Sequence, residues 1–371
     1  MKMFLTELNK SFIHTKGWII LFFLIIFQIS FYGLRNSDYN YQTEQYKEQY
    51  QSYLVTFGGK FDEQKEAKLT AEEERISRAE KESLQSFQKL YYGEYTIEQY
   101  DEDLAAYHNL YEEKMAFQQI QNQYDYARQD ADRRYVLYEN GWYVALQENN
   151  LNFLLIFCVI LLSVRVFTPE YETQMYSMIA STRNGKRHTI TGKLMVCMLF
   201  AITFGVLTSI ICLLFALFKF GLADGKYPLQ SISYFSACPY DLTIWQGYLL
   251  IWFLKIFALC IISMIAALCA VALNRSVSAF FVSGIIVVLP YFLFDVNFIL
   301  HYIPYLGLSV SGLYFRGIEK TVAETEMPQL QSIHLSEILI VVAIGLVLFS
   351  ICLWITVKIW NNRPWSRRQG K

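Results

Sequence analysis

The charged residues with the most regular arrangement lie between residues 165 and 193. Glu170 and Glu172 follow Pro169, and a proline followed by acidic residues is typical of a helix N-terminus. Met175 and Met178 share one face of the short helix that should follow, with Ile179 beside them. The segment then turns basic, at Arg183, Lys186, Arg187 and Lys193. An exposed short helix with an apolar face is suited to docking a soluble subunit, and the alternative is an ordinary basic loop.

Two further charged residues flank long apolar runs. Lys255 lies beside Trp252, and Asp295 follows the run that ends at Phe294. Both positions fit interface residues, with Lys255 reaching outward to water, and both also fit residues along a substrate path or gate. The apolar runs themselves contain no Asp, Glu, His, Lys or Arg. Because ion-coupled carriers place such residues inside the membrane, their absence disfavours that class.

Motifs for catalysis and metal binding are missing. The chain has no GxxxxGK[ST], HExxH, GxSxG or kinase signature, and its five His are scattered. Of the seven Cys, six fall in apolar runs and none forms a CxxC pair. We therefore expect no ATPase activity of its own, no metal site and no disulfide framework. The net charge of −1 gives no reason to expect nucleic acid as a partner.

Composition and hydropathy indicate a membrane protein. Hydrophobic residues make up 54% of the 371 residues and charged residues 18%. Six uncharged runs approach the roughly 20 residues that cross a bilayer, and the second is short unless Trp142, Tyr143 and Val144 extend it. The runs are Gly17–Leu34, Asn149–Val164, Leu194–Phe218, Ile256–Asn274, Ser276–Phe294 and Ile338–Val357.

The distribution of Lys and Arg predicts the orientation. One side of the membrane carries 14 basic residues in its short connections and tails, and the other side carries four. The basic side is cytoplasmic by the positive-inside rule. Both termini are therefore predicted to lie in the cytoplasm of a multi-pass protein of the cell membrane, and residues 35–148 outside it.

The predicted outer segment, residues 35–148, has 13 basic and 23 acidic residues and reads as helical throughout. Gly58-Gly59 should end a first helix, a second should run from Asp62 to Tyr92, and a third should follow Gly93 as far as Tyr138. The last two should pair as an antiparallel hairpin. Its sixteen Tyr between Tyr39 and Tyr143 suit either packing in a thin bundle or recognition of a partner.

The loop between spans two and three resembles that of the permease subunits of ABC-2 type ATP-binding-cassette exporters of Gram-positive bacteria. Those permeases have a Phe-x-x-Glu start, a short coupling helix, a Ser-Thr-Arg-x-Gly-[Arg/Lys] turn and a Lys that opens span three. The matching residues are Phe167, Glu170, Ser181, Thr182, Arg183, Gly185, Lys186 and Lys193. Many relatives have a Gly four or five residues after the Glu, where this chain has Gln174 and Met175.

Other parts of the chain also fit this resemblance. The amphipathic N-terminus Lys2–Lys16 looks like that of the family, and Leu300–Phe315, with Pro304, resembles an outer re-entrant hairpin before the last span. The likeness covers residues 1–34 and 149–371, and the long outer insertion is similar to the phage-infection-protein branch.

The apolar runs, the charge distribution and the resemblance together predict an all-α membrane protein of six transmembrane helices with an extracellular helical hairpin domain between spans one and two. Its parts would be residues 1–34, the outer domain 35–148, and a five-span domain 149–371 with a coupling loop at 165–193 and a re-entrant segment at 295–316. The loop, including Glu172 and Arg187, would couple the chain to the ATPases. Lys255, Asp295 and Pro304 would lie along a substrate path or gate.

As partners, the resemblance implies a second permease copy, identical or different, two ABC ATPase subunits and membrane lipid. ATP and Mg would bind to the ATPases and not to this chain. The substrate would be hydrophobic or amphipathic, such as a peptide, an antibiotic or a lipid, and it would move outward. The alternative is a membrane scaffold or receptor whose outer domain binds an envelope, peptide or phage partner.

Overall fold

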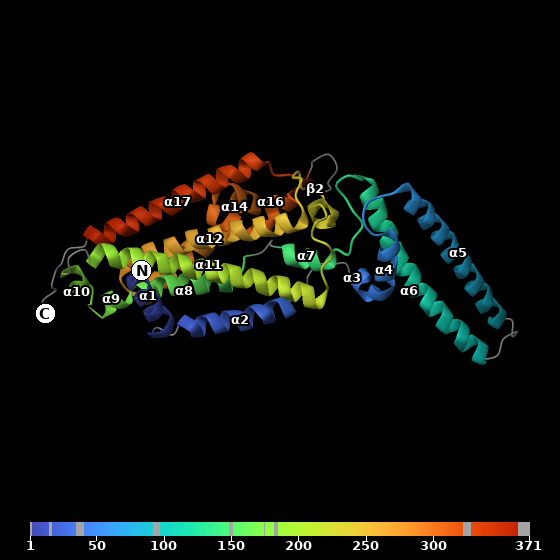
Figure 1. Cartoon of the computed structure of the whole chain (residues 1–371), viewed down its shortest axis with the longest axis horizontal. Coiled ribbons are helices and arrows are strands. Elements are labelled where there is room, and N and C mark those ends of the chain that lie inside the picture. Colours follow the sequence, from blue (N-terminus) through green and yellow to red (C-terminus); the bar gives the residue numbers. More distant parts are fainter. Residues whose placement is uncertain are drawn as a thin grey trace. The chain divides into compact units, whose positions relative to one another are not determined.

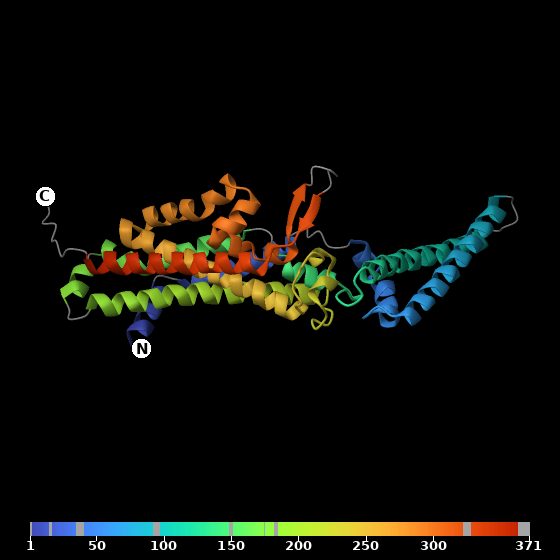
Figure 2. The same cartoon turned by 90° about the horizontal axis from the view of Figure 1, so that it is seen from above.

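The computed structural model is almost entirely α-helical, with one short antiparallel strand pair. It describes residues 2–14, 17–34, 41–91, 97–147, 151–173, 175–181, 185–321 and 328–362. The chain forms two compact units (Figures 1 and 2). The bundle unit comprises residues 1–35, 146–215 and 248–371, and the hairpin unit comprises residues 36–145 and 216–247.

Four described helices are long and apolar enough to cross a membrane. They are α11 (Gly185–Lys219), α12 (Ile244–Leu273), α13 (Ser276–Leu293) and α17 (Leu335–Asn362). A fifth span results if α2 (Gly17–Leu34) is joined to the helical segment before it, from which it bends by 63°. That segment consists of α1 (Lys2–Asn9) and the π-helical turn η1 (Lys10–His14).

The second predicted span contains the short helix α8 (Phe153–Phe167). Its 15 residues extend only about 22 Å at ~1.5 Å per residue, which is less than a bilayer core of about 30 Å. Trp142, Tyr143 and Val144, expected to lengthen this span, lie instead in the separate helix α7 (Asn140–Leu146). Among the described residues, four or five helices therefore meet the length of a span, against the six predicted.

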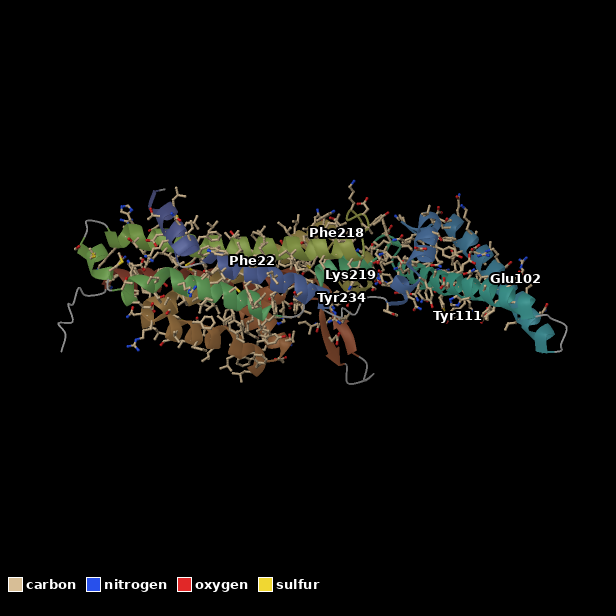
Figure 3. All side chains as sticks on the ribbon, turned by 90° about the horizontal axis from the view of Figure 1, so that it is seen from below. Phe22, Glu102, Tyr111, Phe218, Lys219 and Tyr234 are labelled. Atoms are coloured by element: carbon tan, nitrogen blue, oxygen red, sulfur yellow. The ribbon has the colours of Figure 1, made fainter. Side chains whose placement is uncertain are left out.

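Apolar side chains cover the outside of the bundle unit. Phe22 on α2 is 59% exposed, and Figure 3 shows carbon-rich sticks along the bundle helices. Within the unit, α11 and α12 approach closely at Gly205, where an added Cβ would lie 2.6 Å from Ile256 Cγ1. Such apolar outer faces and small residues at close helix crossings are features of membrane-embedded helices.

The segment between α13 and α17 forms several short elements. They are α14 (Val296–Tyr302), α15 (Pro304–Gly307), the 3₁₀ turn η4 (Leu308–Val310), α16 (Gly312–Arg316), β1 (Ile318–Thr321) and β2 (Pro328–Gln331). Gly317 ends α16 with a φ of 92°, a value that favours glycine, and turns the chain into β1. The two strands pair antiparallel, with Ile318 opposite Gln331.

The hairpin unit is built on α3 (Tyr41–Gln45), α4 (Lys47–Phe57), α5 (Glu63–Tyr91) and α6 (Ile97–Arg128). As predicted, the helix before Gly58-Gly59 ends at Phe57, and Gly59 has a φ of 93°. The helices α5 and α6 pack against each other, and Figure 3 shows polar side chains along them, including Glu102. The prediction that the third helix extends to Tyr138 is wrong, because α6 ends at Arg128 and Val136 pairs with Gly59 instead.

Residues 216–247, which run from the last turn of α11 to the first turn of α12, complete the hairpin unit with the 3₁₀ turns η2 (Leu229–Ser231) and η3 (Ser233–Phe235). The Tyr126 hydroxyl donates to the Gln230 carbonyl at 2.6 Å, and Glu139 accepts hydrogen bonds from the Ser233 backbone and hydroxyl. Burial raises the pKa of the Glu139 carboxyl. The hydrogen bonds from Ser233 lower this pKa but offset only part of the rise. This connection therefore contributes core contacts rather than a free loop.

Candidate functional site

The loop that the sequence predicts to couple the chain to the ATPases folds into two short helices, α9 (Pro169–Glu172) and α10 (Tyr176–Ser181). Pro169 occupies the first turn of α9, where its missing N–H costs no hydrogen bond. Thr168 precedes it, and the Thr168 hydroxyl donates back to the Val164 carbonyl at the end of α8. The chain thus turns directly from α8 into α9, which places Glu170 against the interior of the bundle unit.

Glu170 lies at the centre of a buried ion cluster formed with Lys193, Lys10 and Glu7. The Glu170 side chain is 1% exposed and that of Lys193 is fully buried. Lys193 Nζ lies 2.8 Å from Glu170 Oε1 and 3.3 Å from Glu7 Oε2, and it also donates to the Val166 carbonyl. Lys10 Nζ pairs with the same Glu170 oxygen. The ion cluster therefore joins α9 to α11 and to the N-terminal segment.

The charge balance in the ion cluster determines the state of Glu170. Burial by itself raises the pKa of the Glu170 carboxyl, but the ammonium groups of Lys193 and Lys10 outweigh it and hold that pKa below its ordinary value. Glu170 is therefore ionised at neutral pH. Its second oxygen, Oε2, has no hydrogen-bond partner in the part of the chain that is described. The pairing of two carboxylates with two ammonium groups leaves the ion cluster neutral.

The second carboxylate of α9 connects to a different helix. Glu172 Oε1 accepts hydrogen bonds from the Ser276 backbone N–H at 2.9 Å and from the Ser276 hydroxyl at 2.6 Å. Ser276 is the first residue of α13, so Glu172 takes up a free N–H at the start of that helix. These hydrogen bonds hold the pKa of Glu172 below its ordinary value.

An aromatic cluster links the loop to α17. Trp360 is fully buried and contacts the rings of Phe167, Tyr171 and Tyr176, with centroids 5.1–6.0 Å away. The Tyr176 hydroxyl donates to the Trp360 carbonyl at 2.8 Å, and Trp360 Nε1 donates to the Lys186 carbonyl at 3.1 Å. The α9–α10 loop thus contacts the N-terminal segment, α11, α13 and α17 through specific side chains.

Deeper in the bundle unit, hydrogen bonds join α8, α11 and α12 near Lys193. The hydroxyls of Ser163 and Ser263 are 2.8 Å apart, and both residues are fully buried. Cys197, one turn after Lys193, donates its thiol to the Ser163 carbonyl at 3.8 Å, and its own carbonyl accepts from Ser263. These hydrogen bonds therefore join α8 and α11 to α12 one helical turn from the ion cluster.

Two methionines form an exposed apolar part of the loop surface. Met175 is 50% exposed and Met178 is 68% exposed, and the Ser181 hydroxyl donates to the Met178 carbonyl at 2.7 Å. Arg187 is exposed, and Lys186 Nζ donates to the Asn361 carbonyl at 3.3 Å. Gly185 is the first residue of α11, eight positions before Lys193. Two predicted coupling residues, Thr182 and Arg183, lie outside the described residues.

The three predicted path residues lie apart from this loop. The expectation that Lys255 reaches outward to water is wrong, because Lys255 is 2% exposed on α12, with Nζ 4.3 Å from the centre of the Trp252 ring. Pro304 is buried at the start of α15, facing α17 at Gly345. Asp295 precedes α14 and borders a cavity of about 380 Å³. Among the described residues, no group of three or more His, Cys, Asp or Glu could hold a metal ion.

Sequence reasoning identified Glu170 and Lys193 but not their direct contact with Glu7 and Lys10. The sequence indicated Lys10 only as a cytoplasmic charge and predicted no role for Trp360. Since Lys10 lies 160 residues from Glu170 in the chain, only packing could pair the two. No protein-family model, curated protein or solved structure matches this chain.

Proposed function

We propose that this chain is the membrane-spanning subunit of an ATP-driven exporter of the ABC-2 type. The observation that supports this most is the fixed connection of the α9–α10 loop to four separate helical elements. In this proposal the loop faces the cytoplasm and receives a soluble ATPase subunit on its exposed methionines. Met side chains suit such a role because they are flexible and apolar.

Rigid contacts explain how movement of the loop would reach the membrane. A displacement of α9 would move Lys193 and Lys10 with Glu170, because separating a buried ion pair is costly. The same displacement would act on α13 through Glu172 and on α17 through Trp360. In the proposed mechanism, ATP-driven closure of the ATPases therefore rocks several helices together and opens a path for an apolar or amphipathic substrate.

We further propose that the chain has six spans, whereas four or five described helices have sufficient length to cross a membrane. The N-terminal segment and α2 form the first span, and α8 forms a second, short span, so that six spans place both termini inside and the hairpin unit outside. A second permease copy completes the path. The direction of transport and the ATPase partners follow from the sequence resemblance alone.

A comparison of two substitutions at Met178 tests the docking surface. The tagged full-length protein is purified from its host in mild detergent, and the bound chains are identified. We expect a P-loop ATPase with the wild type and with Met178→Leu, and its loss with Met178→Glu, which places a charge on the exposed apolar face. Recovery of only envelope or extracellular proteins in every case would refute the transporter proposal and favour a scaffold or receptor.

Coupling is tested by reconstituting the complex with a Glu170→Ala subunit. The ATPase should still bind, because Glu170 is buried beneath the docking surface, but ATP hydrolysis should no longer drive substrate movement. Glu170→Asp, which retains the charge, should keep part of the transport. Full transport by Glu170→Ala in folded, ATPase-bound complexes would contradict a role of the ion cluster in coupling.

A further inference from the structure

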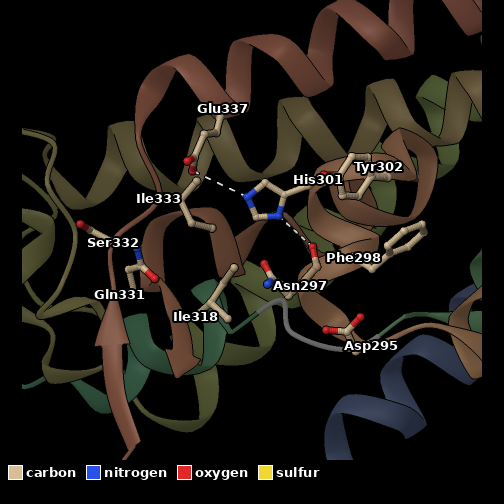
Figure 4. Close-up of a pocket in the computed structure, with 10 residues that line it drawn as sticks. All are labelled: Asp295, Asn297, Phe298, His301, Tyr302, Ile318, Gln331, Ser332, Ile333 and Glu337. Atoms are coloured by element: carbon tan, nitrogen blue, oxygen red, sulfur yellow. Dashed lines mark hydrogen bonds and ion pairs between the residues drawn. The ribbon is translucent and has the colours of Figure 1, made fainter. Parts of the chain in front are cut away.

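The cavity that Asp295 borders lies between α14, the strand pair and the start of α17, and polar residues line it. The cavity of about 380 Å³ falls in the range of small-molecule sites. Figure 4 shows the lining side chains, which come from segments up to 42 positions apart in the chain. They are Asp295, Asn297, Phe298, His301, Tyr302, Ile318, Gln331, Ser332, Ile333 and Glu337.

The charge of this cavity determines whether it attracts an anionic or a cationic ligand. Asp295 and Glu337 are both carboxylates, and the lining includes no Lys or Arg. The nearby Arg316 on α16 pairs with Glu319 on β1. The remaining basic group of the lining is His301, so the cavity carries negative charge whether that ring is neutral or protonated. An anionic ligand is disfavoured and a cationic one is attracted.

The hydrogen bonding of His301 makes the cavity rich in acceptors. His301 Nδ1 lies 2.8 Å from the Asn297 carbonyl, which can only accept, so Nδ1 carries the proton. In the neutral ring, Nε2 is then an acceptor that faces Glu337 Oε2 at 3.7 Å. Two acceptors at this separation do not satisfy each other. Glu337 Oε2 also accepts from the His334 backbone N–H at 3.3 Å, so this carboxylate is already engaged.

Further polar groups around the cavity are available to a ligand. Within the described part of the chain, the side chains of Asp295, Asn297, Gln331 and Ser332 have no hydrogen bond or ion pair with other protein groups. Figure 4 shows Asp295 and Glu337 on opposite sides of His301 and Asn297. The two carboxylates thus border the cavity from two directions, and Asp295 is the one not already engaged.

Aromatic rings give the cavity an apolar wall beside these acceptors. Phe298 and Tyr302 line it, and their centroids are 4.9 Å apart on successive turns of α14. Ile318 and Ile333 contribute further apolar surface. Carboxylates next to aromatic rings are the combination that recognises organic ammonium groups. A bare divalent metal ion is a poor fit, since no group of three or more metal-ligating residues occurs in the described chain.

We propose that this cavity binds an organic ammonium group, with the cation at Asp295, the negative charge of Glu337 across the cavity, and the attached apolar part against Phe298 and Tyr302. The group belongs either to a free amine or to the amino headgroup of a lipid. This inference does not rest on the proposed transport function, because it concerns residues that the α9–α10 loop does not contact. It gives Asp295 the role of a ligand-binding residue.

The test uses the matched probes 2-phenylethylamine and 2-phenylethanol, which differ in charge and hardly in shape. Binding to the purified full-length protein is measured by saturation-transfer NMR at neutral pH. We expect the amine to bind and the alcohol to bind at least about 10-fold more weakly. Asp295→Asn should weaken amine binding by about 10-fold, and Glu337→Gln, which removes the second negative charge of the lining, should weaken it by a smaller factor. The control Glu102→Gln, which changes an exposed carboxylate of α6 outside the lining, should leave it unchanged.

Equal binding of amine and alcohol, or unchanged amine binding in both lining variants, would overturn the proposal. A Phe298→Leu variant provides a second measurement, which should weaken the amine without removing a charge. Nanodiscs of phosphatidylglycerol, with or without phosphatidylethanolamine, distinguish the sources. Competition by phosphatidylethanolamine supports a lipid headgroup as the natural ligand, and undiminished binding supports a free amine.

Discussion

The ion cluster around Glu170 makes a quantitative prediction for stability. Glu170→Gln removes a fully buried negative charge and leaves the ammonium of Lys193, which is also fully buried, with Glu7 and the Val166 carbonyl. Breaking one partner of a buried pair costs about 3–5 kcal/mol, and the remaining contacts of Lys193 place the expected loss near 3 kcal/mol. Lys193→Met should cost about the same, because it leaves Glu7 without its ammonium partner.

A double-mutant cycle isolates the pair. Replacing both charges removes the unpaired group that makes each single substitution costly, so the double variant should cost about 2 kcal/mol less than the sum. The assay is equilibrium unfolding of the purified protein in mixed micelles with increasing SDS. Glu172→Gln, which changes an exposed carboxylate of the same helix, serves as the control and should cost about 1 kcal/mol or less.

The sign of the pH dependence follows from the lowered pKa of Glu170. Its stabilising contribution is complete above the ordinary value of 4.5 and is lost as the pH falls through the lower value of the folded protein. The stability difference between wild type and Glu170→Gln should therefore be constant from pH 7 to about 5 and should shrink below 4.5. A Glu170→Gln variant as stable as Glu172→Gln, with additive single substitutions, would refute the reasoning.

Three further predictions test other parts of the structure. Gly205→Ala should destabilise the bundle unit by about 1–3 kcal/mol in the same SDS titration, whereas Gly33→Ala, which meets no atom within 4 Å, should not. Glu139→Gln should stabilise the hairpin unit at pH 7 by roughly 1 kcal/mol, and this difference should disappear below pH 4.5. The measurement is thermal unfolding followed by circular dichroism. A loss of stability at pH 7 would show that the charge of Glu139 is favourable. Ser163→Ala and Ser263→Ala should each cost about 1 kcal/mol and together less than the sum, and additive costs would mean that their 2.8 Å contact contributes nothing.

Local features of the chain determined much of the helix content. The apolar runs that begin near Leu194, Ile256, Ser276 and Ile338 all became helices of spanning length, because hydropathy over about 20 residues is a property of the segment itself. The helix pair at 63–91 and 97–128 and the break at Gly59 also followed from periodicity and from glycine. The loop residues Glu170 and Lys193 were identified from their types and order.

Long-range packing decided the remainder. The periodicity predicted a helix as far as Tyr138, but the chain after Arg128 is not helical. There the Ser231 hydroxyl accepts a hydrogen bond from the Tyr135 N–H, and Val136 pairs with Gly59. Residues 216–247 joined the hairpin unit although they follow it by more than 70 positions. Lys10 reached Glu170, and Trp360 reached the loop, only because the helices pack together. A sequence pattern shows which face of a helix is apolar. A buried charge is stable only with a partner of opposite charge, and which charges become buried together is determined only in the folded chain.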